Sequence, residues 1–173
     1  METTPMTPID ADAASAMWRD YAVANPGVAQ LFDIYEAEQF GDSAEMADEL
    51  LALILDGRKR ATSSHAAEYR NDGDQFPAIG SHWISCDGSG IPRAIRRIVE
   101  LRVAPFAAVD AQFAYDEGED DRTLESWRHE HWRFFSRVCA ARRATFSEDD
   151  ELILERFAVV WPPEVADAVP LQP

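Results

Sequence analysis

Hydrophobic residues recur at helical spacing in two long stretches of the chain. In residues 43–57 they lie three or four positions apart, at Met46, Ala47, Leu50, Leu51 and Ile54. This spacing places them on one face of a helix, for which Ser43 or Asp42 is a candidate N-cap and Gly57 a stop. Residues 123–143 carry a second apolar stripe that includes Trp127. The two stretches predict amphipathic helices.

Strand-like patterns alternate with these helices. Residues 82–86 and 91–103 flank Asp87-Gly88-Ser89-Gly90, a composition typical of a hairpin loop. Residues 152–161 are largely apolar, and Pro162-Pro163 ends them. We therefore expect one antiparallel hairpin and a final buried strand.

The remaining patterns favour an α+β fold. Shorter helices are predicted over residues 11–25, 64–70 and 109–115, whereas residues 31–40 fit a strand and a helix equally well. Helices and strands are interspersed without regular βαβ alternation, which favours α+β over a doubly wound sheet. The strands are long enough to curl into a small β-barrel with helices packed on it.

Length and composition limit the organisation of the chain. The 173 residues, of which 46% are hydrophobic, fit one domain with a buried core. We expect an N-terminal extension with a helix over residues 1–30, the main domain over residues 31–163, and a tail over residues 164–173. Trp18 could serve a dimer interface, but the pattern does not indicate an oligomeric state.

Charge and cysteine content exclude several classes of function. The net charge of −16 repels polyanions, so any contact with nucleic acid should be local and should not depend on a broad phosphate-binding surface. The two cysteines have no metal-type spacing, and no cofactor motif is present, so we predict neither a metal nor a cofactor. The chain starts without a signal-like segment and has no apolar run near the roughly 18 residues that span a bilayer. These features indicate a protein of the cytoplasm.

Residues 58–64 form the one concentrated basic run in this acidic chain, Arg-Lys-Arg followed by Ala-Thr-Ser-Ser. A threonine hydroxyl needs an adjacent base to act as a nucleophile. Lys59 could be that base, since we expect the flanking arginines to lower its pKa. If the segment turns helically, the spacing of three places Lys59 and Thr62 on one face. The run could therefore pair an amine with a hydroxyl for chemistry, and it could equally bind a ligand without chemistry.

Several blocks together resemble the ASCH domain family, in an order and spacing that cover about residues 31–163. They are Phe40-Gly41-Asp42, Ala47-Asp48-Glu49-Leu50, the Gly-x-Lys-x-x-Thr motif at Gly57–Thr62, Glu100–Phe106, Phe113–Asp121, Trp127 with His131 and Phe134-Phe135, and Phe157–Trp161. The resemblance implies a PUA-like small β-barrel and a cleft for RNA or a modified nucleoside. It also implies a metal-independent catalytic set of Lys59, Thr62 and, by its strand position, Glu100.

Further residues are candidates for ligand binding. Arg58 and Arg60 could hold a phosphate or carboxylate, and Ser63 could add a hydroxyl. Tyr69 could stack on a base, and Arg97 could face the same groove. Asp42 is either a helix cap or a ligand-binding acid.

Two classes of function follow. The first is a hydrolase, either an amidohydrolase of the acetylated-cytidine type or a ribonuclease. The second is a module that binds RNA or a nucleotide without chemistry, and a purely structural role is a third possibility. Simpler interpretations also stand. Glu100 could pair with Arg97 or Arg102 across a strand, residues 116–121 could be a solvated acidic loop, and His131 could be a core or satisfied helix residue.

Overall fold

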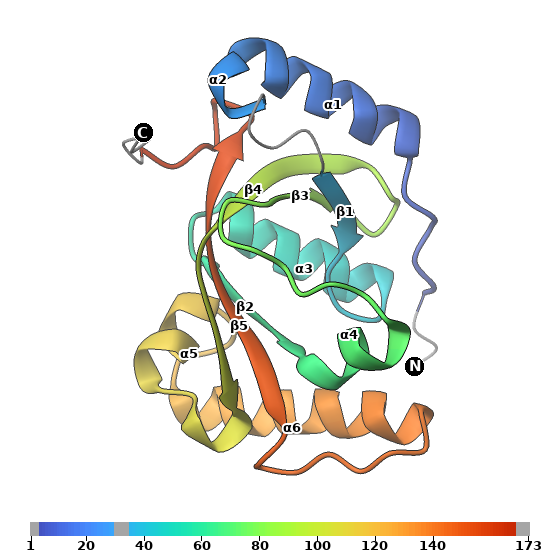
Figure 1. Cartoon of the computed structure of the whole chain (residues 1–173), viewed down its shortest axis with the longest axis vertical. Helices are drawn as coiled ribbons and strands as arrows, with labels where there is room; N and C mark the ends of the chain where they lie inside the picture. The colour runs from blue at the N-terminus through green and yellow to red at the C-terminus, as the bar shows by residue number, and fades with distance from the viewer. Residues whose placement is uncertain (1–3, 30–34, 169–173) are drawn as a thin grey trace. The chain divides into compact units, whose positions relative to one another are not determined.

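A computed structural model describes residues 4–29 and 35–168 (Figure 1). The helices are α1 (Ala11–Ala24), α2 (Pro26–Ala29), α3 (Ala44–Leu55), α4 (Ala66–Asp72), α5 (Ala111–Glu117) and α6 (Leu124–Ala141), with a 3-10 turn η1 (Phe106–Ala108). The strands are β1 (Tyr35–Gln39), β2 (Ala61–His65), β3 (His82–Cys86), β4 (Pro92–Pro105) and β5 (Glu151–Trp161).

The strands form one mixed sheet in the order β1-β3-β4-β5-β2. β1 pairs parallel with β3, whereas β3 with β4 and β2 with β5 pair antiparallel. A curled mixed sheet with helices packed on it confirms the predicted α+β class and its small barrel-like sheet. Of the ambiguous residues 31–40, the described part Tyr35–Gln39 is a strand, and residues 31–34 lie outside the described residues.

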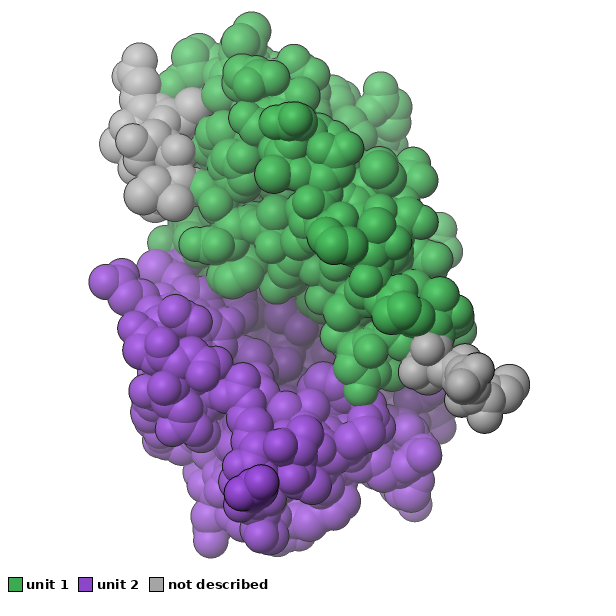
Figure 2. All heavy atoms as spheres, turned by 90° about the vertical axis from the view of Figure 1, so that its right-hand side faces the viewer, with its two compact units in different colours: residues 1–57, 79–99, 157–173 green, residues 58–78, 100–156 purple. Residues whose placement is uncertain are grey.

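The chain divides into two compact units (Figure 2). Unit 1 comprises residues 1–57, 79–99 and 157–173, and unit 2 comprises residues 58–78 and 100–156. In unit 1, α1 packs on one side of the sheet, where Trp18 and Tyr21 contact Ile84 and Ile95. The core on the other side joins Ile54 of α3 to Ala94, Phe157 and Val159. The predicted boundaries at residues 30 and 163 stay predictions.

The core of unit 2 joins α5 and α6 to strands β2 and β5. Its buried members include Phe106, Phe113, Trp127, Phe135, Leu152 and Leu154. Ring pairs such as Phe106 with Trp127, whose centroids lie 5.2 Å apart, fix α6 against this core. The described residues that hold Lys59 all belong to this unit.

Side-chain caps start the helices where the sequence predicts. Ser43 accepts a hydrogen bond from the Met46 amide at 3.2 Å, so Ser43 rather than Asp42 caps α3. Thr123 caps α6 by the same kind of bond from the Ser126 amide, at 3.1 Å. The helical turn considered for Lys59–Thr62 is absent, because Ala61–His65 is the strand β2. The helix expected over residues 64–70 is α4.

Candidate functional site

Lys59 lies just before β2, and its side chain points into unit 2. It is 1% exposed, whereas Arg58 is exposed and Arg60 is half-buried. Lysine is rarely buried unless its ammonium is paired. The basic run is therefore not a uniform cationic surface, since its middle residue is an internal cation.

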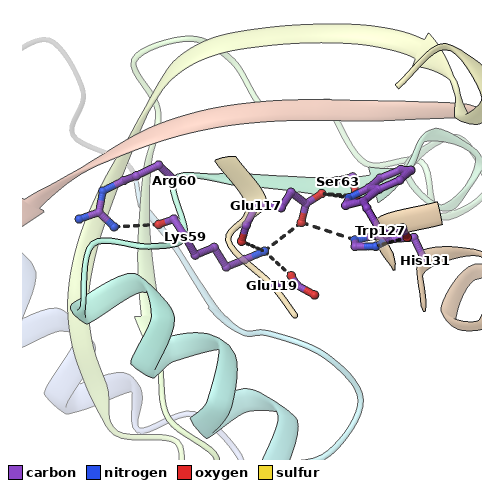
Figure 3. A network of polar contacts seen from close by, with 7 residues as sticks. All are labelled: Lys59, Arg60, Ser63, Glu117, Glu119, Trp127 and His131. Carbon is purple, nitrogen blue, oxygen red and sulfur yellow. Dashed lines mark hydrogen bonds and ion pairs between the residues drawn. The ribbon is translucent and has the colours of Figure 1, made fainter. Parts of the chain in front are cut away.

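Two carboxylates hold the Lys59 ammonium (Figure 3). Nζ donates to Oε2 of Glu117 at 2.9 Å and to Oε1 of Glu119 at 2.5 Å. The backbone oxygen of Glu117 accepts a third contact at 3.5 Å. The Glu117 side chain is 1% exposed and that of Glu119 25%, so the cluster reaches the surface at Glu119.

Glu117 is the centre of this network. Its Oε1 accepts hydrogen bonds from the Ser63 hydroxyl at 2.8 Å and from the Trp127 indole N–H at 3.0 Å. Its Oε2 lies 3.5 Å from Nε2 of His131, whose ring stacks on Trp127 with centroids 4.3 Å apart. Each oxygen of this buried carboxylate thus has a strong partner, which is what burial of the charge requires.

The charges of the cluster set its protonation. Burial alone would lower the pKa of Lys59, but the carboxylates of Glu117 and Glu119 raise it above its usual value. Burial would raise the pKa of Glu117, yet Lys59 and His131 hold it well below its usual range. Lys59 is therefore an ammonium at neutral pH. The expectation that Arg58 and Arg60 lower its pKa is wrong, because the two carboxylates outweigh them.

A close approach of backbones brings Lys59 to Glu117. Asp110 caps α5, and the helix ends at Gly118, which has φ +76°. A Cβ on Gly118 would lie 2.3 Å from the backbone oxygen of Arg58. The amide of Arg60 donates to the backbone oxygen of Asp116 at 2.8 Å. The end of α5 and the residues before β2 thus lie in direct backbone contact, which positions the ion pair.

Strand geometry separates Thr62 from this cluster. Successive side chains of a strand point to opposite faces. Because Ser63 points to Glu117, Thr62 points to the other face of β2, where its partner in register is Glu155. The structure therefore brings together Lys59 and Ser63 of the predicted residues, and it does not place the Thr62 hydroxyl with them.

The other predicted residues lie elsewhere. Glu100 is half exposed and pairs with Arg156 at 2.6 Å, so its contact is a cross-strand ion pair, although not with Arg97 or Arg102. Arg60 donates to the backbone oxygen of Lys59 at 2.7 Å. The Tyr69 ring packs on Phe76 with centroids 5.7 Å apart. Asp42 and Arg97 belong to unit 1, where Asp42 is exposed and Arg97 is half-buried.

Comparison with known proteins places this arrangement in a family. The family model for the ASCH domain matches residues 36–161, which is most of the chain. The chain belongs to the ASCH domain family. This confirms the resemblance seen in the sequence.

Two solved structures share the fold. An ASCH domain from Lactobacillus crispatus is 30% identical, with a TM-score of 0.83 over 87% of this chain and 96% of that one. Protein EF3133 from Enterococcus faecalis is 32% identical, with a TM-score of 0.77 over 86% of this chain and 88% of that one. The comparison with curated proteins gave no match. Within the described residues, no helix has the length and apolarity to cross a membrane.

Among the residues that the structure describes, two groups of side chains have the spacing of metal ligands. Glu117, Glu119 and His131 offer atoms within 4.8 Å of one another, as do His65, Cys139 and Asp150. In the first group the Lys59 ammonium contacts both carboxylates and supplies the positive charge. In the second, His65 lies between the other two, with its Nδ1 3.6 Å from the Cys139 sulfur and its Nε2 3.3 Å from Asp150.

Sequence reasoning did not assign the most connected residues of the site. Residues 116–121 were interpreted as a solvated loop, and this is wrong for Glu117, which is the last residue of α5 and is buried. His131 is a satisfied residue of α6, as one prediction from the sequence has it, and its partners are the Trp127 backbone oxygen and the central carboxylate. Glu117 and His131 both lie in sequence blocks that resemble the ASCH family, and this resemblance was the signal that could have pointed to them.

Stability should fall at alkaline pH because of His131. Burial lowers the pKa of its imidazole, but Glu117 raises it above the usual value of 6.5. A raised folded-state pKa contributes stability that is complete below about pH 6.5 and is lost as the pH rises through the folded-state value. We expect urea unfolding of the wild type to show this loss between pH 6.5 and 9, and His131→Gln to show a smaller one. Equal losses in the two proteins would contradict the coupling.

Proposed function

We propose that this ASCH-domain protein acts on RNA or a modified nucleoside and hydrolyses it at the Lys59–Glu117 cluster. ASCH domains are generally RNA-binding, which supports the substrate class. The observation that carries the hydrolase proposal is the contact of the Ser63 hydroxyl with the same buried carboxylate that holds the Lys59 ammonium. A hydroxyl hydrogen-bonded to a base that other groups orient is the usual arrangement of an activated nucleophile.

The proposed reaction is hydrolysis of an amide of the acetylated-cytidine type. Ser63 Oγ attacks the acetyl carbonyl carbon while its proton passes to Glu117 Oε1. The carbon–nitrogen bond breaks, and the leaving amine takes that proton. Water then hydrolyses the acyl-serine and releases acetate. Lys59 and His131 reduce the basicity of Glu117, so the first proton transfer costs free energy, which the oriented contacts must offset.

The roles differ in part from those expected from the sequence. In this proposal Glu117 is the carboxylate in place of Glu100, and Ser63 is the hydroxyl in place of Thr62. Lys59 keeps its place in the site but acts as a fixed ammonium that orients Glu117. Glu119 is partly exposed and is suited to accept a hydrogen bond from an amino group of the ligand.

The matched pair Ser63→Ala and Thr62→Ala tests the assignment, because the two residues are neighbours on opposite faces of β2. With N4-acetylcytidine as substrate, we expect Ser63→Ala to reduce acetate release by about 100-fold or more, as loss of a positioned catalytic group does. Thr62→Ala should leave it nearly unchanged. The opposite ranking would return the nucleophile to Thr62, and an inactive wild-type protein would reject this substrate.

One observation favours the alternative of binding without chemistry. The Lys59 ammonium is fully paired by carboxylates, which suits a fixed recognition element as well as a catalyst. Binding of cytidine or of short RNA with no acetate release and no cleavage would support this alternative. RNA cleavage that is lost in Lys59→Ala and survives repurification would instead support the ribonuclease form of the proposal.

A further inference from the structure

One face of the sheet in unit 1 carries polar side chains that the site around Lys59 does not use. Register places Trp83 of β3 opposite Arg96 of β4, and Ser85 opposite Ala94. Directly opposite residues of an antiparallel pair point to the same face, as do residues two apart in one strand. Helix α1 packs on the other face, through Ile84 and Ile95, whereas Ile54 of α3 packs on this face against Ala94 and Phe157.

Arg96 is the largest fully buried side chain of this face, with 1% exposure. Its Nη2 donates to the Glu38 carboxylate, and three rings surround the guanidinium. The centroids of Phe40, Trp83 and Phe157 lie 4.9, 5.4 and 5.0 Å from its central carbon. Within residues 4–29 and 35–168, neither Nε nor Nη1 of Arg96 has a hydrogen-bond partner. Leaving N–H groups of a buried cation unpaired is costly.

Two neutral groups on the same face share this property. The indole N–H of Trp83 and the hydroxyl of Ser85 are also buried without a partner among the described residues. Native structures rarely leave several buried donors unsatisfied in one place, and such groups mark strain, water or a ligand. Here they combine as donors on Arg96, Trp83 and Ser85, next to the acceptor oxygens of Glu38.

We propose that this face binds the planar amide or ureide edge of a neutral ligand, as a pyrimidine base presents. Carbonyl oxygens of the ligand would accept from Arg96 and Trp83, and a ligand N–H would donate to Glu38. The Glu38 carboxylate offsets the charge of Arg96, so the site has no surplus positive charge with which to hold a phosphate. Glu38 keeps 28% of its side chain exposed, and Trp83 is half-buried, so a ligand would approach the face at these two residues.

This inference does not depend on the proposed hydrolysis, because all of its residues belong to unit 1 and the Lys59 cluster belongs to unit 2. Calorimetric titration of the full chain with uracil, and separately with inorganic phosphate, tests it. We expect uracil to bind and phosphate not to bind. Trp83→Phe keeps the ring and removes the N–H, so it should weaken uracil binding by about 10-fold, the effect of one hydrogen bond in a buried site.

Matched variants separate the two sites. Arg96→Lys should also weaken uracil binding, whereas Arg93→Gln, at an exposed arginine of the same strand, should not. Lys59→Met should leave uracil binding intact while it abolishes any hydrolysis. If Arg96→Lys does not fold, Trp83→Phe decides the question. Absence of uracil binding, equal binding of phosphate, or uracil binding unchanged by Trp83→Phe would each overturn the inference.

Discussion

Replacing Glu117 by alanine is expected to lower the free energy of unfolding by about 3–5 kcal/mol. The change leaves the Lys59 ammonium, which is 1% exposed, with Glu119 as its remaining carboxylate partner. It also removes the acceptor for the Trp127 indole and the Ser63 hydroxyl. Breaking a buried ion pair by removing one partner is costly because the other charge stays buried. Urea unfolding at pH 7 measures the change.

The control for this prediction is Glu119→Ala. Both carboxylates contact the Lys59 ammonium, but a quarter of the Glu119 side chain is exposed and water can replace it. The loss at Glu119 should therefore be smaller than the loss at Glu117. A loss at Glu119 as large as that at Glu117 would show that burial does not decide the strength of these contacts.

Gly118→Ala is expected to destabilise the protein by about 2–5 kcal/mol, the second largest effect. Gly118 has φ +76°, and an L-residue there costs about 1–2 kcal/mol. In addition, its Cβ would lie 2.3 Å from the backbone oxygen of Arg58, so the residues before β2 must move. Overpacking of this kind typically adds about 1–3 kcal/mol. Since the same contact positions Lys59, the variant should also lose any activity of the site.

Gly73→Ala is the matched control for this change. Gly73 has φ +75° but nothing within 4 Å of the added Cβ. It should therefore cost only the backbone term of about 1–2 kcal/mol and leave activity intact. Thermal or urea unfolding of both variants measures the difference. Equal losses would mean that the approach of Arg58 to Gly118 does not constrain the site.

The elements of the fold were predictable because they depend on local signals. The apolar stripe of α3, which ends at Ile54, is recognised from its helical period of 3.6 residues alone. Ser43 caps the same helix through a hydrogen bond from the amide of Met46, three residues along the chain. The Asp87–Gly90 turn was predictable for the same reason, since Asp87 accepts hydrogen bonds from the amides of Ser89 and Gly90 within the turn. The α+β fold class and the hairpin at Asp87–Gly90 were therefore predictable from the sequence.

The centre of the site was not predictable in this way. Lys59 and Glu117 are 58 residues apart, and nothing near Lys59 distinguishes it from the two arginines that flank it. Glu117 is one of several acidic residues in the run 116–121. It is buried because it is the last residue of α5, and the sequence of the run does not show where that helix ends. The strand period of β2 places the Ser63 hydroxyl, and not that of Thr62, beside Glu117, because residues three apart share a face in a helix but not in a strand.

The same limit applies to the strands of unit 1. Arg96 and Arg97 are adjacent, and the sequence allowed either of them to face a groove, with Arg97 named as the ligand-binding candidate. Pairing of β3 with β4 places Arg96 opposite Trp83 and Arg97 opposite His82, so the two arginines lie on opposite faces. Which of the two faces holds the unpaired donors of Arg96, Trp83 and Ser85 depends on how the helices pack on the sheet. The sequence of the strands alone does not show that packing.

The most direct test of the account is a double-mutant cycle of Lys59→Met and Glu117→Ala, with unfolding free energies measured for the wild type, both single variants and the double variant. If a buried ammonium–carboxylate pair organises the site, the double variant is more stable than Glu117→Ala alone, because no unpaired cation is left inside. Two independent losses that add in the double variant would contradict the pairing on which the proposed chemistry depends.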